Sequence, residues 1–190
     1  MVASNYMVFQ HDAKRPFPLS DGSVHCVVTS PPYGGLRDYG TPGQIGLEPT
    51  PQEYVETMVR VFREVRRVLR DDGTCWLNLG DSYANTGSND SSKVGGFTGD
   101  RIRRGAKGIM DSRPRLIPPG LKPKDLVGIP WRVALALQAD GWYLRSDIVW
   151  HKPNPMPESV TDRPTKGHEY VFLLTKAERY HYDADAVKEA

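Results

Sequence analysis

The sequence has few cysteines, no long hydrophobic run and no histidine pattern typical of a metal site. Cys26 and Cys75 are the two cysteines among 190 residues, and both lie in apolar runs, so a disulfide framework is excluded. The five histidines lack the paired spacing of metal ligands. No apolar stretch approaches the roughly 18 residues of a membrane span, and the first ten residues do not resemble a secretory signal. We therefore expect a cytoplasmic globular protein with neither a membrane segment nor a metal.

One segment differs sharply in charge from the rest of the chain. The net charge is +2, but residues 93–124 contain nine Lys or Arg and two Asp, a net charge of +7, which leaves −5 elsewhere. Such a segment is typical of a surface that faces a polyanion, because phosphate neutralisation supplies most non-specific affinity for nucleic acids. A solvated basic loop is the alternative. The candidate phosphate contacts are Arg101, Arg103, Arg104, Lys107, Arg113 and Arg115.

The first third of the chain has the pattern of a strand, a helix and a second strand. The β-branched run at residues 24–29 is bounded by turn residues and predicts a buried strand. Thr50 and Glu53 have the spacing of a capping box, and apolar residues then recur at helical spacing as far as Gly73. We expect Gly73 to end the helix in the left-handed conformation and residues 74–79 to form the next strand. A strand–helix–strand unit predicts parallel pairing.

The remaining chain divides into an irregular basic segment and a second region with regular patterns. The first is rich in Gly, Ser, Pro, Lys and Arg and shows neither helical nor strand periodicity, which favours an insertion. The second predicts a helix at 130–140 and strands at 142–150 and 168–175. We expect three parts: an α/β portion with the candidate catalytic loop at 1–84, the basic insertion at 85–125, and the rest of the same domain at 126–190.

The sharpest signal for chemistry is the loop Thr29-Ser30-Pro31-Pro32-Tyr33 at the end of the first predicted strand. Ligands of open α/β sheets bind at the carboxyl ends of strands. The two prolines fix the backbone and remove N–H donors, so the loop offers acceptors and an aromatic ring but no nucleophile. These groups suit methyl transfer to the exocyclic amine of a nucleobase. The Ser30 hydroxyl and the Pro31 carbonyl would accept from the amine, and Tyr33 would stack on a flipped base. A plain turn with two prolines is the alternative.

Several motifs in the same order resemble the bacterial and phage amino-methyltransferases of DNA, which make N4-methylcytosine or N6-methyladenine. The motifs are TSPPY, LRDYG, PQEYVETMVRVFREVRRVL, TCWLNLGDSY and RSDIVWHKPNPMPESVTDRPTKGHEYVFLLTK. The resemblance is to the subgroup whose catalytic region precedes its cofactor region. It implies an α/β fold with part of a Rossmann-like methyltransferase sheet, mostly parallel with helices on both faces, plus the basic loop insertion. It also implies S-adenosylmethionine as cofactor and DNA as partner.

The resemblance also assigns roles to individual residues. Ser30, Pro31, Pro32 and Tyr33 match the catalytic loop of the family. A serine before PPY is commoner among the cytosine-N4 enzymes, so cytosine N4 is favoured over adenine N6.

Other positions match family segments near the cofactor or the target base. Asp12 lies where the family has an acidic residue that faces the cofactor, with a turn as the alternative, and Thr29 is a second candidate cofactor contact. Asp81 has the same two interpretations, cofactor contact or cap. His168 and Glu169 match a family segment beside the target base, where a solvated strand entrance is the alternative.

One family motif, a Gly-rich F-x-G-x-G turn, is not found in the sequence. Gly34-Gly35 and residues 95–99 lack its spacing. We therefore expect about the first two-thirds of a methyltransferase, with the cofactor half lost by truncation or supplied by a second chain, and weak cofactor binding by residues 1–190. Two other classes remain open: a catalytically inert DNA-binding fragment, and a structural subunit that folds only with a partner chain.

Overall fold

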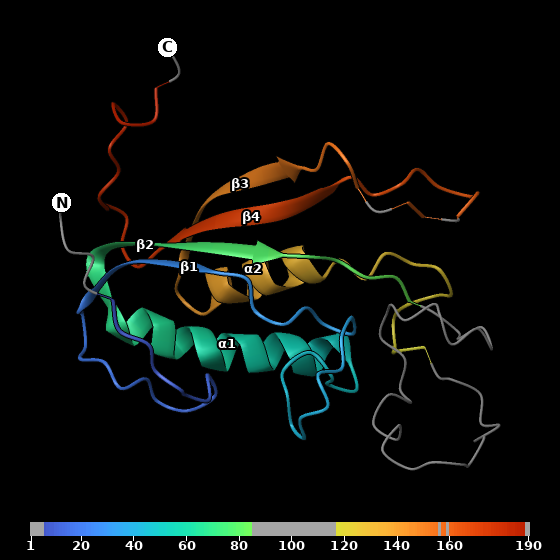
Figure 1. Ribbon diagram of the computed structural model, residues 1–190, viewed down its shortest axis with the longest axis horizontal. Coiled ribbons are helices and arrows are strands. Elements are labelled where there is room, and N and C mark those ends of the chain that lie inside the picture. Colours follow the sequence, from blue (N-terminus) through green and yellow to red (C-terminus); the bar gives the residue numbers. More distant parts are fainter. Residues whose placement is uncertain (1–5, 85–116, 156, 159, 189–190) are drawn as a thin grey trace.

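In the described part of the chain, a four-stranded sheet packs against two helices (Figure 1). The computed structural model describes residues 6–84, 117–155, 157–158 and 160–188. In chain order the elements are β1 (Val24–Thr29), α1 (Pro51–Val68), β2 (Leu69–Leu79), α2 (Ile129–Ala139), β3 (Tyr143–His151) and β4 (His168–Thr175). The predicted α/β class is confirmed, and the predicted strand–helix–strand unit forms with β1 and β2 in parallel.

The sheet is mixed, with the strand order β1-β2-β4-β3. β1 pairs in parallel with β2, whereas β4 is antiparallel to both β2 and β3. β1, β2 and β3 therefore run in the same direction, as a mostly parallel sheet predicts. The pairings differ from that prediction, because β1 with β2 is the parallel pair and both pairs that include β4 are antiparallel. The cause is the connection from β3 to β4, which contains no described helix. An antiparallel partner can be reached without the helical crossover that parallel strands usually need.

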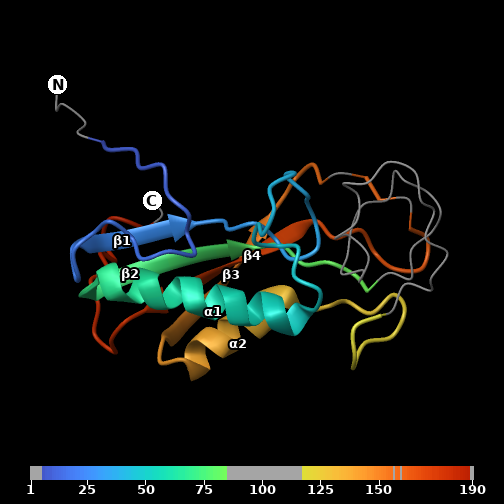
Figure 2. The same cartoon turned by 90° about the horizontal axis from the view of Figure 1, so that it is seen from below.

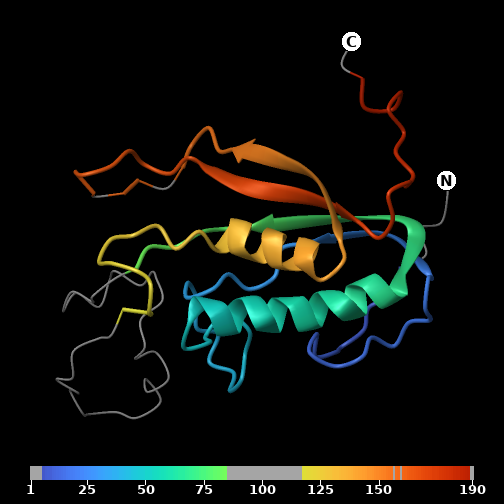
Figure 3. The same ribbon diagram turned by 180° about the vertical axis from the view of Figure 1, so that it is seen from behind.

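Both helices lie on the same face of the sheet (Figures 2 and 3). α1 buries an apolar stripe against the strands and α2, and the rings of Phe62 and Trp142 meet edge to face at 6.4 Å. No helix covers the opposite face within the described part of the chain, so helices on both faces were wrongly expected for these residues. Val149 and Trp150 of the edge strand β3 are 56% and 53% exposed. Neither described helix is long and apolar enough to cross a membrane.

The ends of α1 show one correct and one incorrect prediction. The Thr50 hydroxyl accepts a hydrogen bond from the Glu53 backbone N–H at 3.2 Å, which confirms the predicted start. The helix ends at Val68, before Gly73, which lies within β2 and does not have a positive φ. Gly73 serves a different purpose, because a β-carbon there would lie 2.9 Å from the carbonyl oxygen of His25 in β1. Close approach of two strands, and not a helix end, requires this glycine.

The two ends of the predicted insertion lie side by side. The Ala84 N–H donates to the Asp125 carbonyl, and the Lys124 N–H donates to the Ala84 carbonyl, both at 2.8 Å. The chain thus leaves the end of β2 and returns to the same place before α2 begins. The predicted phosphate contacts lie outside the described residues and stay a prediction: Arg101, Arg103, Arg104, Lys107, Arg113 and Arg115.

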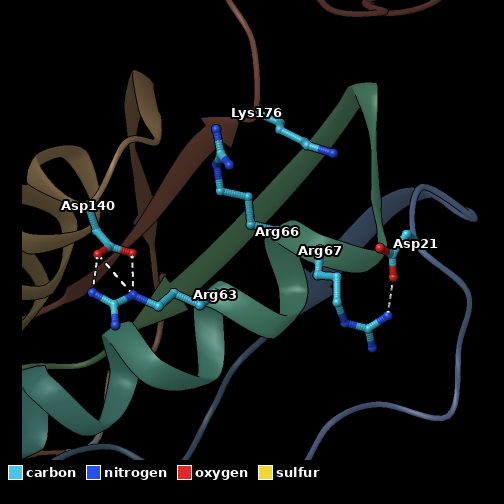
Figure 4. A pocket seen from close by; sticks show the side chains of 6 residues that line it. All are labelled: Asp21, Arg63, Arg66, Arg67, Asp140 and Lys176. Carbon is cyan, nitrogen blue, oxygen red and sulfur yellow. Dashed lines mark hydrogen bonds and ion pairs between the residues drawn. The ribbon is translucent and has the colours of Figure 1, made fainter.

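A cluster of charged side chains lies near the carboxyl ends of α1 and α2, at the other end of the sheet from the Ser30–Tyr33 loop. They line a pocket of about 410 Å³ (Figure 4): Asp21, Arg63, Arg66, Arg67, Asp140 and Lys176. Arg63 pairs with Asp140 and so connects α1 to the end of α2, while Arg67 pairs with Asp21 and connects α1 to the segment before β1. These ion pairs hold the helices and the amino-terminal segment together.

Candidate active site

Three connecting segments meet at one end of the sheet (Figure 1). Two of them follow β1 and β2, and the third joins β3 to β4. Because β4 runs antiparallel to β2, its first residues lie beside the last residues of β2, and Leu79 is paired with Tyr170. The predicted catalytic loop after β1 therefore faces residues from two other strands, at the edge where α/β proteins bind ligands.

Tyr33 is the centre of a hydrogen-bond network at this edge. Its hydroxyl lies 2.6 Å from Asn78 Oδ1 and 3.1 Å from Glu169 Oε2, and it accepts from Ser30 Oγ at 3.1 Å. Ser30 Oγ also lies 3.1 Å from Asn78 Oδ1. Asn78 Nδ2 donates to the Tyr170 carbonyl at 3.1 Å, which fixes the amide with its oxygen toward Tyr33. The structure thus joins Ser30 and Tyr33 to Asn78, which was not predicted, and to Glu169 of the His168-Glu169 segment.

Glu169 carries a negative charge in a largely buried position. Its side chain is 18% exposed, and Oε1 forms an ion pair with Nζ of Lys152, the first residue after β3. Burial acts to raise the pKa of Glu169, but hydrogen bonds from Lys152, Tyr33 and Asn78 outweigh it and lower the pKa below the usual value of 4.5. Burial raises the pKa of Tyr33, and the charge of Glu169 adds to this shift. The network therefore holds a carboxylate beside a neutral phenol.

A hydrogen bond and two close contacts with glycines hold the loop in position. The fully buried Tyr54 of α1 donates its hydroxyl hydrogen to the Pro32 carbonyl at 2.9 Å, and burial raises the pKa of this phenol. The Tyr33 ring lies against Gly80, where an added β-carbon would be 2.5 Å from Cε2. The carbonyl of Tyr33 lies against Gly46, which has a φ of +98°. The loop is thus anchored to α1 and to the end of β2.

The other predicted site residues have different surroundings. Asp12 is exposed, and its described hydrogen bonds are those of a local turn, since Oδ1 accepts from the Lys14 N–H at 3.0 Å. Thr29 is the last residue of β1 and pairs with Leu77. The His168 ring meets the Tyr170 ring edge to face at 5.3 Å. Glu169, the residue after His168, makes the contact with Tyr33, because successive strand residues point to opposite faces.

Asp81 caps α2. Its side chain is 3% exposed, and Oδ1 accepts hydrogen bonds from the N–H groups of Gly128 at 2.9 Å and Ile129 at 3.0 Å. Lys166 Nζ lies 3.7 Å from the other carboxylate oxygen. A negative charge stabilises a helix amino terminus, and Gly128 has no side chain that could cap it. Of the two interpretations of Asp81, the structure exhibits the cap.

The chemistry of the site follows from these groups. It combines acceptor oxygens with an aromatic ring, and its carboxylate is already paired with a lysine. Among the described residues no three His, Cys, Asp or Glu side chains are grouped so that they could hold a metal ion. The arrangement suits binding and orientation of an amine.

Comparisons with known proteins agree with this class of site. The family model N6_N4_Mtase, described as DNA methylase, matches residues 24–190, and the chain belongs to this DNA methylase family. It is 57% identical over 171 residues to the Type II methyltransferase M.Cfr9I of Citrobacter freundii, which covers 90% of this chain and 54% of that protein. The chain therefore spans about half the length of this curated relative.

Two solved structures share the fold. The PvuII DNA methyltransferase (cytosine-N4-specific) is 18% identical with a TM-score of 0.58, and the match covers 90% of this chain and 48% of that one. TTHA0409 of Thermus thermophilus, solved in complex with S-adenosyl-L-methionine, is 23% identical with a TM-score of 0.52, over 92% of this chain and 55% of that one. At these identities the likeness concerns the fold, and it agrees with a partial Rossmann-like sheet.

Proposed function

We propose that the chain carries the target-base site of a Type II DNA methyltransferase, which transfers a methyl group from S-adenosylmethionine to the exocyclic amine of a flipped base. The observation that carries this proposal is the hydrogen-bond state of Ser30. Its hydroxyl hydrogen points to Tyr33 or Asn78, so its lone pairs are left to accept from an amine. Membership of the DNA methylase family supports the same reaction.

The residues of the loop prepare the amine for attack. The lone pair of a nucleobase amine is delocalised into the ring, so the nitrogen must become tetrahedral before it can act as a nucleophile. Acceptance of its two N–H bonds by the Ser30 hydroxyl and the Pro31 carbonyl favours that geometry in the transition state. The Pro32 carbonyl is not available, because Tyr54 donates to it. Tyr33 supplies the ring on which a flipped base stacks.

The donor set of the site fits a reaction whose electrophile comes from a cofactor. Ser30, Pro31 and Tyr33 offer acceptors and a ring but no activated methyl group, and S-adenosylmethionine supplies one as a sulfonium when bound. Thr29 and Asp12 are the residues of this chain that we assign to the cofactor. The exposed carboxyl end of β1 places Thr29 beside Ser30, which suits that role. Asp12 would have to leave its present turn contact with Lys14.

Cytosine N4 is the proposed target, with adenine N6 as the second candidate. A serine at position 30 favours the cytosine enzymes of the family. The PvuII enzyme, which is cytosine-N4-specific, shares the fold. The basic segment at 85–125 is assigned to DNA, with phosphate contacts from its arginines and lysines. His168 is assigned to the surroundings of the target base.

The cofactor-binding part of the proposal involves a further segment with an F-x-G-x-G turn, in the same polypeptide or in a second one. β1 is an edge strand in which Val28 is 78% exposed, so its free edge can pair with additional strands. The length of M.Cfr9I, of which this chain covers 54%, is consistent with such a segment. Residues 1–190 are accordingly expected to bind the cofactor weakly. Micromolar binding of S-adenosylmethionine in a calorimetric titration of this chain would contradict that expectation.

The test of the function uses a chimera in which this chain replaces the matched 171-residue region of M.Cfr9I. Expression in a host whose DNA lacks amino-methylated bases, followed by mass spectrometry of its nucleosides, measures N4-methylcytosine and N6-methyladenine separately. We expect N4-methylcytosine from the chimera and at least a hundredfold loss with Ser30→Ala or Tyr33→Ala. Tyr182→Ala, at a tyrosine 51% exposed in the carboxyl-terminal segment, is the matched control.

The outcomes separate three functions. Full activity in both loop variants contradicts the proposed site. If the chimera makes N6-methyladenine and no N4-methylcytosine, the target base is adenine and not cytosine. A chimera that binds duplex DNA with a steep salt dependence but transfers no methyl group favours an inert DNA-binding fragment.

A further inference from the structure

We infer that Lys152 and Glu169 set the direction of the hydrogen bonds around Ser30, so that the site receives an amino group and disfavours a carbonyl at the target base. This inference rests on the proposed function, in which Ser30 contacts the base. It concerns two residues outside the catalytic loop. Neither touches the substrate in this scheme, and both act through Tyr33 as positioning residues.

The directions of the hydrogen bonds follow from the number of hydroxyl hydrogens in the network. Ser30 and Tyr33 each carry one hydroxyl hydrogen, and the oxygens around them are Asn78 Oδ1 and Glu169 Oε2. An ionised carboxylate can only accept, and so can an amide oxygen. Both hydrogens are therefore directed into the network, along the path from Ser30 to Tyr33 to Glu169 or Asn78. Ser30 is left with lone pairs toward the base, which can bind an N–H but not a C=O.

Contacts on their far sides hold Asn78 Oδ1 and Glu169 Oε2 as hydrogen-bond acceptors. Asn78 is fixed because its Nδ2 donates to the Tyr170 carbonyl, which cannot donate in return. Glu169 is fixed because Lys152 Nζ pairs with its other oxygen and favours the ionised form. A protonated Glu169 would bring a third hydrogen into the network and compete with Ser30 for the Tyr33 oxygen. In part of the molecules the Ser30 hydrogen would then point toward the base.

Several polar and charged groups from different elements act on Tyr33 and Glu169. Tyr33 reaches Glu169 from the loop after β1, Asn78 from β2 and Lys152 from the segment after β3. Arg37 acts on Tyr33 and lowers its pKa, against the effects of burial and of Glu169. Lys152 is the cation nearest to Glu169 among these groups. It also lies 5.8 Å from the centre of the Trp150 ring, which limits where its ammonium can move.

The first experiment titrates the full chain by itself and does not depend on activity. Carbon-13 NMR of the glutamate carboxyls should place the pKa of Glu169 below the usual value of 4.5, and Lys152→Met should raise it, because burial then acts without the ion pair. Ultraviolet titration, with Tyr33→Phe as the blank, should show a lower pKa for Tyr33 in Glu169→Gln. Lys188→Met, at an exposed ion pair with Asp185, should change neither value. An unmoved Glu169 in Lys152→Met overturns the inference.

The second experiment measures methyl transfer by the chimera between about pH 5 and pH 8. The parent rate should show no acid limb due to Glu169, since its pKa lies below this range. Lys152→Met should retain the rate at pH 8 within about threefold and lose rate progressively toward pH 5, as Glu169 becomes protonated. The double variant Lys152→Met/Glu169→Gln should lack the limb and be slow throughout. A merely structural loss would lower the rate equally at every pH.

The outcomes distinguish this inference from the proposed function. If the parent chimera transfers methyl groups and Lys152→Met shows no loss of rate toward acid pH, the role of Glu169 is overturned and the proposed function stays in place. A parent chimera that transfers no methyl group overturns both the function and the role that depends on it, even if the titrations behave as expected.

Discussion

The ring of Tyr33 lies directly against the backbone of Gly80. A β-carbon at Gly80 would come within 2.5 Å of Cε2 and 2.6 Å of Cδ2 of that ring. Gly80 follows β2, so the end of the second strand determines where the aromatic ring of the first loop can lie. The position of the ring in turn brings its hydroxyl to Asn78 and Glu169. A glycine at the end of a strand thus belongs to the site although it has no side chain.

Gly80→Ala should therefore reduce methyl transfer without unfolding the protein. The added methyl group forces the ring to move, and overpacking of this kind costs about 1–3 kcal/mol. We expect at least a tenfold loss of N4-methylcytosine in the chimera and a circular dichroism spectrum like that of the parent. Gly167→Ala is the control, because its nearest neighbour, Pro155 Cγ, would be 3.6 Å from the added carbon. Parent-level transfer by Gly80→Ala would contradict the idea that Gly80 determines the position of the Tyr33 ring.

Tyr54→Phe should destabilise the protein by about 1 kcal/mol, since the Pro32 carbonyl loses the hydroxyl that donates to it at 2.9 Å. For a chain of this size the melting temperature should fall by about 2–4 °C. Thermal unfolding followed by circular dichroism measures the change. Tyr182→Phe, at a position 51% exposed, should stay within about 0.5 kcal/mol of the parent. Equal melting temperatures for the parent and Tyr54→Phe would show that the hydroxyl does not anchor the loop.

The parts of the fold that depend on local sequence could be predicted. The start of α1 follows from Thr50, Pro51 and Glu53, which interact within one turn. The strand that Ser30 bounds is local in the same sense, but its predicted burial is wrong, because β1 lies at the edge of the described sheet with Val28 78% exposed. The helix end was misassigned because Gly73 is required by its closeness to His25 in β1, a contact across 48 positions. Periodicity within one segment does not contain such a contact.

The candidate site shows the same division. The sequence predicts Ser30 and Tyr33 from a short motif, whereas Asn78 and Glu169 reach them from 45 to 136 positions away. One signal for them does exist in the sequence. Asn78 follows the short apolar run CWL of β2, and Glu169 precedes the apolar run YVFLL of β4, so each is a polar residue near the strand end that borders a loop. Their convergence also requires β4 beside β2, a placement that the strand order of the sequence does not reveal.

Asp81→Ala should lower stability by about 1–2 kcal/mol through loss of the cap on α2. The substitution removes the acceptor of the Gly128 and Ile129 N–H groups and leaves Lys166, with 17% of its side chain exposed, without this carboxylate. Asp81→Asn keeps an oxygen but loses the charge, so we expect an intermediate effect. Urea denaturation measures the midpoints at an unchanged slope. Asp185→Ala, with its carboxylate 87% exposed, is the control, and a midpoint for Asp81→Ala equal to that control would contradict the cap.

The two cysteines should differ in their reactivity toward a thiol reagent. Cys26 is exposed on β1, whereas Cys75 is buried in β2, and burial raises its pKa to about 12. A raised pKa means less thiolate, so at pH 8 almost no Cys75 is ionised, and the reagent cannot reach it. We expect one fast-reacting thiol per native chain and two in denaturant. Cys26→Ser should remove the fast phase, while two fast thiols in the native parent would show that β2 is not buried at Cys75.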